Sequence, residues 1–180
     1  QILLNGRDLA ALSGADLRMA RRQMGVVFQG YNLLMQKTVA ENVAFPLKLD
    51  KYDKAAVDAR VKELLELVGL ADRAGSYPSQ LSGGQRQALT LLMATMVPPQ
   101  LLLLDEHTAA LDPATAEKVL ALTRRVVAES RITCLMVTHN MHQALELGNR
   151  TLMMDAGRIV FDVKGEALSL IHISEPTRLR

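Results

Sequence analysis

Two stretches of the sequence combine residue types that can do chemistry. Ser82-Gly83-Gly84-Gln85 lies at the start of a predicted helix, and the apolar run LLLL that follows later ends in Asp105-Glu106. A glycine-rich turn at a helix start can hold a phosphate, because unpaired backbone N–H groups and the positive end of the helix dipole converge there. Yet these 180 residues contain no G-x-x-x-x-G-K-[ST] loop, and no glycine is followed directly by lysine. The turn must therefore be explained without a phosphate-binding loop in the same sequence.

Polar residues also follow three predicted strands. Gln29 follows GVVF, Asp105-Glu106 follows LLLL, and His139 follows LMVT. In open α/β sheets ligands bind beyond the carboxyl ends of the strands, so we expect these four side chains around one cleft. Each residue alone also has an ordinary structural interpretation, as a helix cap, a loop hydrogen-bonding group or a buried histidine.

The elements that would position these residues follow from periodicity and breakers. We predict strands at QILLNG, MGVVFQ, LLLLDE and ITCLMVTH, the first ended by Asn5-Gly6. We predict helices at ALSGADLRMARRQM, starting at Ser13 or Asp16, and at TVAENVAFPLKL, KAAVDARVKELLELVGL, residues 85–96, ATAEKVLALTRRVVAES and NMHQALEL. RTLMMDAG and RIVFDV are predicted to form a hairpin through residues 155–157.

Several details of these elements are specific enough to be checked. Asp112 is the expected N-cap of its helix, with Pro113 at the first position. LLLL is expected to be a parallel strand buried on both faces. The helix over residues 54–70 is expected to bury one face, made of Val57, Val61, Leu64, Leu65 and Val68. The alternation of strands and helices predicts an α/β fold with a mainly parallel sheet, interrupted by a helical block at roughly 38–96.

Composition limits the classes of protein. With 49% hydrophobic and 22% charged residues, the chain can form one good core. The net charge is only +2 and the basic residues are dispersed, so we expect no nucleic-acid partner. Cys134 is the only cysteine, which excludes an internal disulfide within these residues and fits a reducing compartment. We find no apolar run of the roughly 20 residues that a transmembrane helix needs, and no signal peptide, so we expect at most docking to a membrane.

One segment does not belong to the predicted fold. Residues 168–178, LSLIHISEPTR, resemble the translation of a sequencing-library transposase adaptor. The tail 168–180 is therefore left out of the fold prediction.

Taken together, LSGGQ, LLLLDE, ALD, Gln29 and His139 resemble, in order and spacing, the ATP-binding subunit of ATP-binding cassette (ABC) transporters. The resemblance covers residues 1–167 and implies an ABC-type P-loop NTPase core, incomplete here, with an α-helical subdomain at about 30–96. Residues 81–85 would be the signature loop, LLLLDE the Walker B strand, residues 110–112 the D-loop, Gln29 the Q-loop residue and His139 the switch histidine.

The resemblance also implies roles for these residues, with ATP and Mg²⁺ as cofactors. Asp105 and Gln29 would bind Mg²⁺, and Glu106 would act as general base on the attacking water. His139 and Gln29 would act as catalytic residues that contact the γ-phosphate, the metal and the water. A further group would bind the nucleotide seated on a second ATPase subunit: Ser82, Gly83, Gly84, Gln85 and Asp112. Cys134 and His142 have no role in this scheme and are interpreted as core and helix-surface residues.

The family further implies partners and a location. These are ABC permease subunits, a second ATPase subunit and, indirectly, a solute-binding protein, at the cytoplasmic face of the bacterial inner membrane. The helical block would bind a coupling helix of the permease, with Tyr31, Leu33 and Leu34 sharing in recognition. Family members carry a P-loop upstream of the strand at QILLNG. We therefore expect an N-terminally truncated ATPase that is inactive as these 180 residues alone.

The transported solute is less sharply indicated. The first half is most similar to methionine and other amino-acid importer ATPases, whereas the second half is similar to another importer group and has His107 where Pro, Ala or Ser is usual. A chimera joined near LSGGQ and an ordinary divergent homologue both explain this difference. A soluble ABC-type ATPase without a membrane partner is the alternative function. A degenerate, non-catalytic cassette would usually lack Glu106 or His139, and both are present.

Overall fold

The structure is a computed structural model and describes residues 1–49 and 52–165. The chain divides into two compact units, residues 1–136 and the part that begins at Val137, and each is described by itself. The predicted adaptor-derived tail, residues 168–180, lies outside the described residues.

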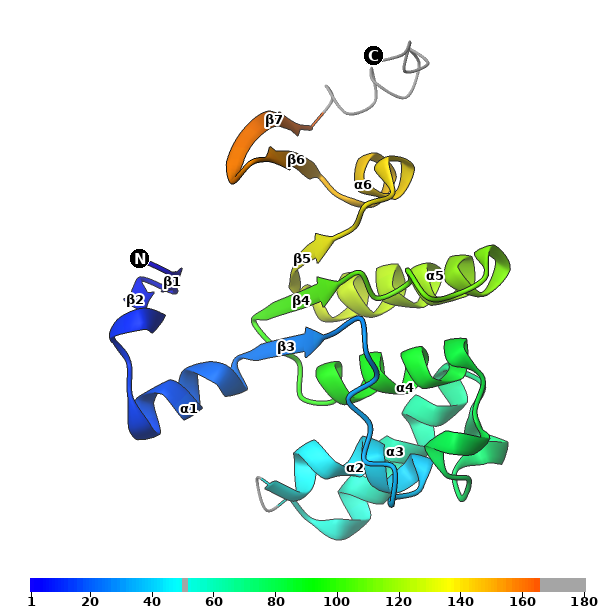
Figure 1. Ribbon diagram of the computed structural model, residues 1–180. Coiled ribbons are helices and arrows are strands. Elements are labelled where there is room, and N and C mark those ends of the chain that lie inside the picture. Colours follow the sequence, from blue (N-terminus) through cyan, green and yellow to red (C-terminus); the bar gives the residue numbers. More distant parts are fainter. Residues whose placement is uncertain (50–51, 166–180) are drawn as a thin grey trace. The chain divides into compact units, whose positions relative to one another are not determined.

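The first unit is built around a three-stranded sheet with the strand order β3-β4-β5 (Figure 1). The strands are β3 (Met24–Val27), β4 (Leu101–Asp105) and β5 (Thr133–Val137). β3 and β4 are parallel, with Met24 opposite Leu101 and Val27 opposite Leu104. The predicted strands and the parallel pairing are therefore observed, with more than seventy residues of chain between the two neighbours.

Two helices pack on one face of this sheet. They are α4 (Gly83–Thr95) and α5 (Pro113–Ser130). The buried cluster between them and the strands consists of Val27, Leu91, Leu102, Leu104 and Ile132. Gly25 of β3 lies so close to α4 that a Cβ there would overlap the backbone oxygen of Ala94. The close approach of strand and helix thus requires a residue without a side chain.

The prediction that LLLL is buried on both faces is wrong for the described structure. Leu102 and Leu104 are buried, but Leu101 and Leu103 are only partly buried. On β5, Leu135 is 55% exposed. The physical reason is that α4 and α5 both cover the same face of the sheet, so burial alternates along each strand.

The helical block has a hydrophobic core of its own. It comprises α2 (Val39–Leu49), α3 (Lys54–Leu67), and two short 3₁₀ helices, η2 (Ala71–Arg73) and η3 (Pro78–Gln80). As predicted, α3 buries Val57, Val61, Leu64 and Leu65, whereas Val68, its C-cap, is only partly buried. The buried members of this core run from Leu33 to Met96. This core supports the helical subdomain at 30–96, whose boundaries stay a prediction.

Helix α4 connects the two cores. Leu91 and Ala94 face the sheet, while Leu89, Leu92 and Met96 belong to the core of the helical block. Figure 1 shows α4 between β3 and the pair α2 and α3. Helix α4 is therefore buried around most of its circumference, which agrees with the unbroken run of buried residues from Gln87 to Leu92.

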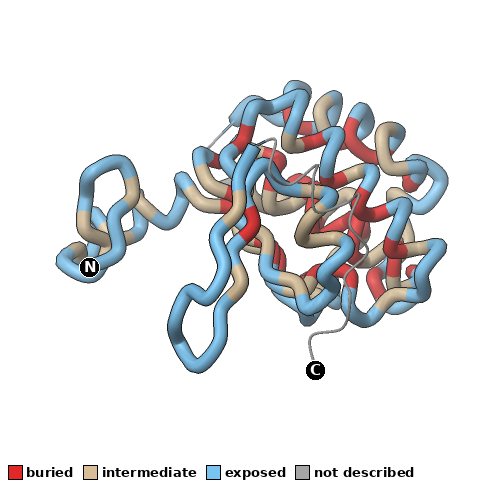
Figure 2. The backbone as a smooth tube through the Cα atoms, turned by 90° about the horizontal axis from the view of Figure 1, so that it is seen from above, coloured by how far each residue is buried: buried red, intermediate tan, exposed pale blue. Residues whose placement is uncertain are grey.

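The amino-terminal stretch folds locally. β1 (Leu3–Leu4) and β2 (Arg7–Asp8) form a hairpin through Asn5 and Gly6, both at positive φ. It is followed by η1 (Leu9–Ala11) and by α1 (Gly14–Arg22), whose N-cap is Ser13, the first of the two predicted starts. The sequence predicted only the first strand, because Arg7-Asp8 is too short to show a pattern. Figure 2 shows this stretch as exposed and intermediate residues.

The second unit contains α6 (Met141–Leu147), β6 (Arg150–Asp155) and β7 (Arg158–Lys164). The strands form the predicted hairpin, which turns through Ala156 and Gly157 at positive φ. Arg150 donates two hydrogen bonds, of 2.8 and 2.7 Å, to the Asp162 carboxylate across the hairpin. Of the helices in the described part of the chain, none has the length and apolar character needed to cross a membrane.

Candidate functional site

Parallel pairing brings Gln29 and Glu106 to the same edge of the sheet. Each lies two residues beyond a member of the last paired positions, Val27 of β3 and Leu104 of β4. Asp105, the last residue of β4, is exposed, as is Gln29, and Glu106 is partly buried. This edge is the carboxyl end of both strands, the position at which α/β sheets bind ligands.

Glu106 has an unusual backbone conformation. Its φ is +44°, in the left-handed region that residues with side chains rarely adopt. Its carbonyl oxygen accepts a hydrogen bond of 2.9 Å from Ala109 N, which closes a turn directly after β4. Such strain persists where the surrounding structure fixes it, and it is concentrated at functional sites. No residue pattern around Glu106 predicted this conformation.

His107, the residue that departs from the usual family pattern, is buried. It is 3% exposed, and its Nε2 lies 3.2 Å from Thr123 Oγ1 on α5. Burial lowers the pKa of His107 from 6.5 to about 4, because an imidazolium would lose its hydration. The side chain is therefore neutral near pH 7.

The loop that follows Gln29 is held by Asn42 of α2, a residue that our sequence analysis did not single out. Asn42 is fully buried, and its Oδ1 accepts a hydrogen bond of 2.8 Å from Leu34 N. Its Nδ2 lies 2.9–3.1 Å from the carbonyl oxygens of Leu34, Lys37 and Thr38. One amide thus fixes both ends of the segment 34–38. The position of Asn42 was the only indication in the sequence: it directly follows Glu41, which forms a capping pair with Thr38 at the start of α2.

Tyr31 and Leu33 have structural contacts that limit their predicted role in partner recognition. Leu33 is 8% exposed and belongs to the core of the helical block, so its side chain is not available to a partner. The ring centroid of Tyr31 lies 4.8 Å from the guanidinium carbon of Arg86, which places the Gln29 loop against α4. The expectation for Leu33 is therefore wrong, because the loop turns this residue inward.

The signature residues form a tightly packed helix start. Ser82 is the N-cap of α4, and its Oγ accepts from Gln85 N at 3.2 Å while Gln85 Oε1 accepts from Ser82 N at 2.9 Å. This reciprocal pair is a capping box. The first backbone N–H groups of a helix, here those of Gly83 and Gly84, have no acceptor within the helix and can receive an anion.

Both glycines also have packing roles. A Cβ at Gly83 would lie 3.1 Å from Tyr31 Oη and 3.3 Å from Leu111 Cδ2. A Cβ at Gly84 would overlap the Thr115 methyl group of α5. The close contact between the start of α4 and the start of α5 thus requires a glycine at position 84, whereas a Cβ at position 83 would be tight against the ends of the Tyr31 and Leu111 side chains. From the sequence, helix capping explained one glycine, whereas the structure gives a packing reason for each.

Asp112 caps α5 as predicted. Its carboxylate accepts from Thr115 N at 3.0 Å. A hydrogen bond from the Thr115 side chain, together with the backbone bond, holds the pKa of Asp112 below its ordinary value. The exposed carboxylate is therefore kept ionised at the start of the helix, where negative charge is favourable.

His139 belongs to the second unit. It lies two residues after the end of β5, in the link to α6, and is exposed. Asn140 caps α6 by accepting from Gln143 N at 3.1 Å. His142 is an exposed residue of α6, 3.4 Å from Glu146. Cys134 packs against the sheet core, where burial raises the pKa of its thiol. The structural interpretations of His142 and Cys134 are thereby confirmed.

The donors at the sheet edge fit Mg²⁺ better than a metal held by protein alone. Within residues 1–49 and 52–165, no three His, Cys, Asp or Glu side chains gather as a metal-binding group. Asp105 and Gln29 offer oxygen ligands at one exposed edge. Mg²⁺ commonly uses one or two carboxylates and completes its octahedron with waters and substrate phosphates.

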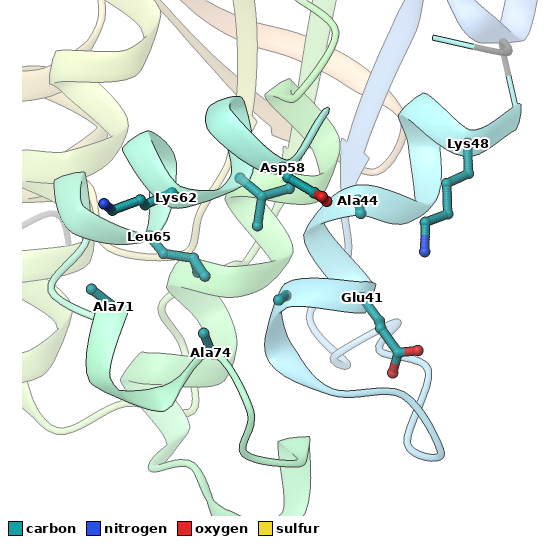
Figure 3. Close-up of a pocket in the computed structure, with 10 residues that line it drawn as sticks. Glu41, Ala44, Lys48, Asp58, Lys62, Leu65, Ala71 and Ala74 are labelled. Carbon is teal, nitrogen blue, oxygen red and sulfur yellow. The ribbon is translucent and has the colours of Figure 1, made fainter. Parts of the chain in front are cut away.

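A cavity of about 360 Å³ lies in the helical block, apart from these residues. Figure 3 shows it between α2, α3 and η2. Its lining combines small or aliphatic side chains with charges of both signs: Ala40, Glu41, Ala44, Lys48, Asp58, Val61, Lys62, Leu65, Ala71 and Ala74. Glu41 is already engaged, because its carboxylate accepts from Thr38 N at 2.8 Å at the start of α2.

Comparison with known proteins identifies the family. The family model described as "ABC transporter" matches residues 1–109. The chain belongs to the ABC transporter family. This confirms the resemblance and, with it, the α/β fold of an ABC-type P-loop NTPase.

Relatives and a solved structure of this family align over most of the chain. The methionine import ATP-binding protein MetN of Caulobacter vibrioides is 46% identical over 178 residues, which is 99% of this chain and 54% of that protein. MetN 1 of Shouchella clausii is 45% identical over 170 residues, 94% of this chain and 49% of that protein. The dimeric structure of a post-hydrolysis state of the ATP-binding cassette MJ0796 bound to ADP and Pi has a TM-score of 0.78 and 31% identity, covering 89% of this chain and 71% of that one.

This ABC transporter chain spans about half the length of the curated relatives that it matches. The alignment with the Caulobacter protein runs through both halves of the chain, on either side of the signature. The chimera and the divergent homologue both stay hypotheses.

Proposed function

We propose that this chain is part of the ATP-binding and ATP-hydrolysing subunit of an ABC importer that takes up methionine or another amino acid. The observation that carries the proposal is the parallel pairing of β3 and β4, which brings Gln29 and Asp105-Glu106 to one sheet edge. The names of relatives that are 43–48% identical support the solute.

The proposed roles follow from the chemistry of each side chain. Asp105 and Gln29 would hold Mg²⁺, which supplies positive charge against the phosphates of ATP. Glu106 would accept a proton from the attacking water, and His139 would donate a hydrogen bond to the γ-phosphate. Because phosphoryl transfer depends mainly on positioning and charge, these residues need rigid placement more than unusual reactivity.

The signature residues would act on a second ATPase subunit. The N–H groups at the start of α4, which have no acceptor within the helix, and the Ser82 hydroxyl would hold the γ-phosphate of ATP seated on that subunit, and Asp112 would lie at the same subunit contact. The dimeric state in the name of the MJ0796 structure supports a paired arrangement. The capping box and the packing of Gly84 would keep this helix start rigid before the partner arrives.

The remaining partners would be permease subunits and, indirectly, a solute-binding protein, at the cytoplasmic face of the bacterial inner membrane. We assign the permease contact to the cavity of the helical block, whose lining includes the small side chains of Ala40, Ala71 and Ala74, which allow a helix to approach closely. Ala71→Trp, at an exposed position of the lining, should fill the cavity and abolish co-purification with the permease while leaving ATP turnover intact. Failure of the unmodified protein to co-purify with any permease would instead support a soluble ATPase.

The central experiment uses the chain joined to the P-loop-bearing amino-terminal segment of a methionine import relative, since these 180 residues contain no such loop. Glu106→Gln should reduce phosphate release at least about a hundredfold and leave ATP binding unchanged, because the amide keeps the shape but cannot accept the proton. Glu117→Gln, a change of the same type on α5, is the control. Near wild-type turnover in Glu106→Gln would remove Glu106 from the mechanism.

The 180-residue chain alone should release no measurable phosphate and bind MgATP only weakly. The backbone N–H groups and lysine of a P-loop make most contacts to the β- and γ-phosphates. Titration calorimetry with ATP tests this, and a micromolar dissociation constant with steady turnover would place the site elsewhere.

A further inference from the structure

The turn after β4 has to fix Glu106 in a conformation that its backbone does not favour. A left-handed φ costs a residue with a Cβ roughly 1–2 kcal/mol, so neighbouring contacts must compensate. The hydrogen bond from Ala109 N to the Glu106 carbonyl closes the turn but does not by itself join the turn to another element. An anchor to another element is needed to hold it.

His107 provides that anchor. Together with Thr108 it is buried directly after Glu106, whereas Asp105 before it is exposed. The Nε2 atom of His107 lies 3.2 Å from Thr123 Oγ1, sixteen residues away on α5. The contact therefore joins the turn that carries Glu106 to the middle of a long helix that is packed on the sheet.

The direction of this hydrogen bond is fixed by the Thr123 hydroxyl. Its oxygen lies 2.9 Å from Val119 O, and a carbonyl can only accept, so the single hydroxyl proton is donated there. Thr123 Oγ1 can then only accept from His107, which must carry its proton on Nε2. In a neutral ring this defines the tautomer, with the proton on Nε2.

We propose that His107 is a positioning residue: its Nε2–H···Oγ1 hydrogen bond to Thr123 of α5 holds the turn that carries Glu106, and so aims the Glu106 carboxylate. The catalytic half of this inference rests on the proposed function, whereas the hydrogen bond and its tautomer do not. His107 touches neither nucleotide nor water and acts only through the turn.

The first test detects the His107–Thr123 hydrogen bond directly in the 180-residue chain. Long-range ¹H–¹⁵N spectra of the histidine rings should show His107 as the Nε2-protonated tautomer, with a slowly exchanging Nε2 proton. Thr123→Val should remove the slow exchange, because the acceptor is lost. Thr95→Val is the matched control, since Thr95 is also buried and donates to the carbonyl four residues back, at 2.8 Å, but lies in the other core-forming helix. An Nδ1-protonated His107, or slow exchange that persists in Thr123→Val, would overturn the anchor.

The second test measures how the His107–Thr123 hydrogen bond affects kcat in the chain completed with a P-loop. Thr123→Val and His107→Leu should lower kcat about tenfold to a hundredfold at unchanged KM for ATP, because a displaced base loses its alignment with the water. His107→Gln and Thr123→Ser keep the donor and the acceptor and should restore most of the rate. Thr95→Val should be unchanged.

The outcomes distinguish failure of the positioning role of His107 from failure of the proposed function. Full kcat in Thr123→Val, when Glu106→Gln is inactive, would overturn positioning by His107 and leave the proposed function standing. Equal loss of kcat in Thr123→Ser and Thr123→Val would also overturn it, because the hydroxyl would then be irrelevant. Full turnover in Glu106→Gln would remove Glu106 from the mechanism and, with it, the positioning role of His107, but would leave the ATPase proposal standing.

Discussion

Substitution of Gly84 by alanine isolates the packing role of the second signature glycine. An alanine Cβ at this position would overlap the methyl carbon of Thr115, but it would lie 3.6 Å from Thr115 Cβ, an ordinary contact. The conflict is therefore confined to one methyl group on α5. Removing that methyl with Thr115→Ser should relieve it while keeping the hydroxyl.

The Thr115 methyl cannot simply rotate away. The Thr115 side chain makes the hydrogen bond that contributes most to the lowered pKa of Asp112, and Thr115 N donates to the same carboxylate at 3.0 Å. Turning the side chain would break the first of these bonds and weaken the start of α5. The helices must then separate, or the cap must be lost.

The expected magnitude follows from two opposing effects. Forcing an extra methyl into a packed contact costs about 1–3 kcal/mol, whereas replacing glycine by alanine in a helix gains up to about 1 kcal/mol. We expect Gly84→Ala to lower the free energy of unfolding by about 1–2 kcal/mol. In the Thr115→Ser background only the helix gain remains, so Gly84→Ala should be neutral or stabilising there.

The assay is urea unfolding of the four proteins of this cycle, followed by circular dichroism, with Gly83→Ala as comparison. A Cβ at Gly83 would meet the ends of the Tyr31 and Leu111 side chains and not Thr115, so Thr115→Ser should not rescue that variant. The reasoning fails if Gly84→Ala costs the same free energy in both backgrounds, because the Thr115 methyl would then not be the obstacle.

Three further outcomes are expected. Asn42→Ala should lower the free energy of unfolding by about 1–3 kcal/mol in urea titrations, since it removes the acceptor of Leu34 N and the donor to Lys37 O, and Asn42→Asp should not rescue it. His107 has a pKa lowered from 6.5 to about 4, so its contribution to stability is present above pH 6.5 and is lost as pH falls toward 4. Between about pH 7 and about pH 5 the loss should be about 2 kcal/mol, and it should disappear in His107→Leu. Gly25→Ala should be more destabilising than Gly84→Ala, because it meets the backbone oxygen of Ala94, which no side-chain substitution can remove.

The sequence predicted well those elements that depend on neighbouring residues. Asp112 followed by Pro113 marks the start of α5, and that helix begins there with the expected cap. The two strand-like runs joined through Asp155-Ala156-Gly157 predicted the β6–β7 hairpin. In each case the stabilising hydrogen bonds join residues a few positions apart, so the local pattern contains most of the information.

Features that depend on distant parts of the chain were missed. The apolar run of β4 predicted burial on both faces, but only the arrangement of α4 and α5 decides which face is covered. His107 was recognised as unusual, yet nothing in the sequence pairs it with Thr123. The left-handed backbone of Glu106 is likewise set by tertiary contacts. The sequence therefore predicted the order of the site residues along the chain, but not the tertiary contacts that hold them in place.

The signature residues have structural roles of their own, and these roles lower their value as evidence for phosphate binding. Ser82 and Gln85 are required by the capping box, and Gly84 by its contact with α5, so these residues would be favoured even in a protein that binds no phosphate. The two acids at the carboxyl end of β4, Asp105 and Glu106, differ in this respect. Asp105 is an exposed acid at the last position of a strand, where aspartate is disfavoured and caps no helix, and Glu106 occupies a backbone conformation that a glycine would adopt at lower cost. Since folding alone would select other residues at both positions, the acids at the sheet edge are the stronger argument for chemistry, and the signature gains its weight from their presence.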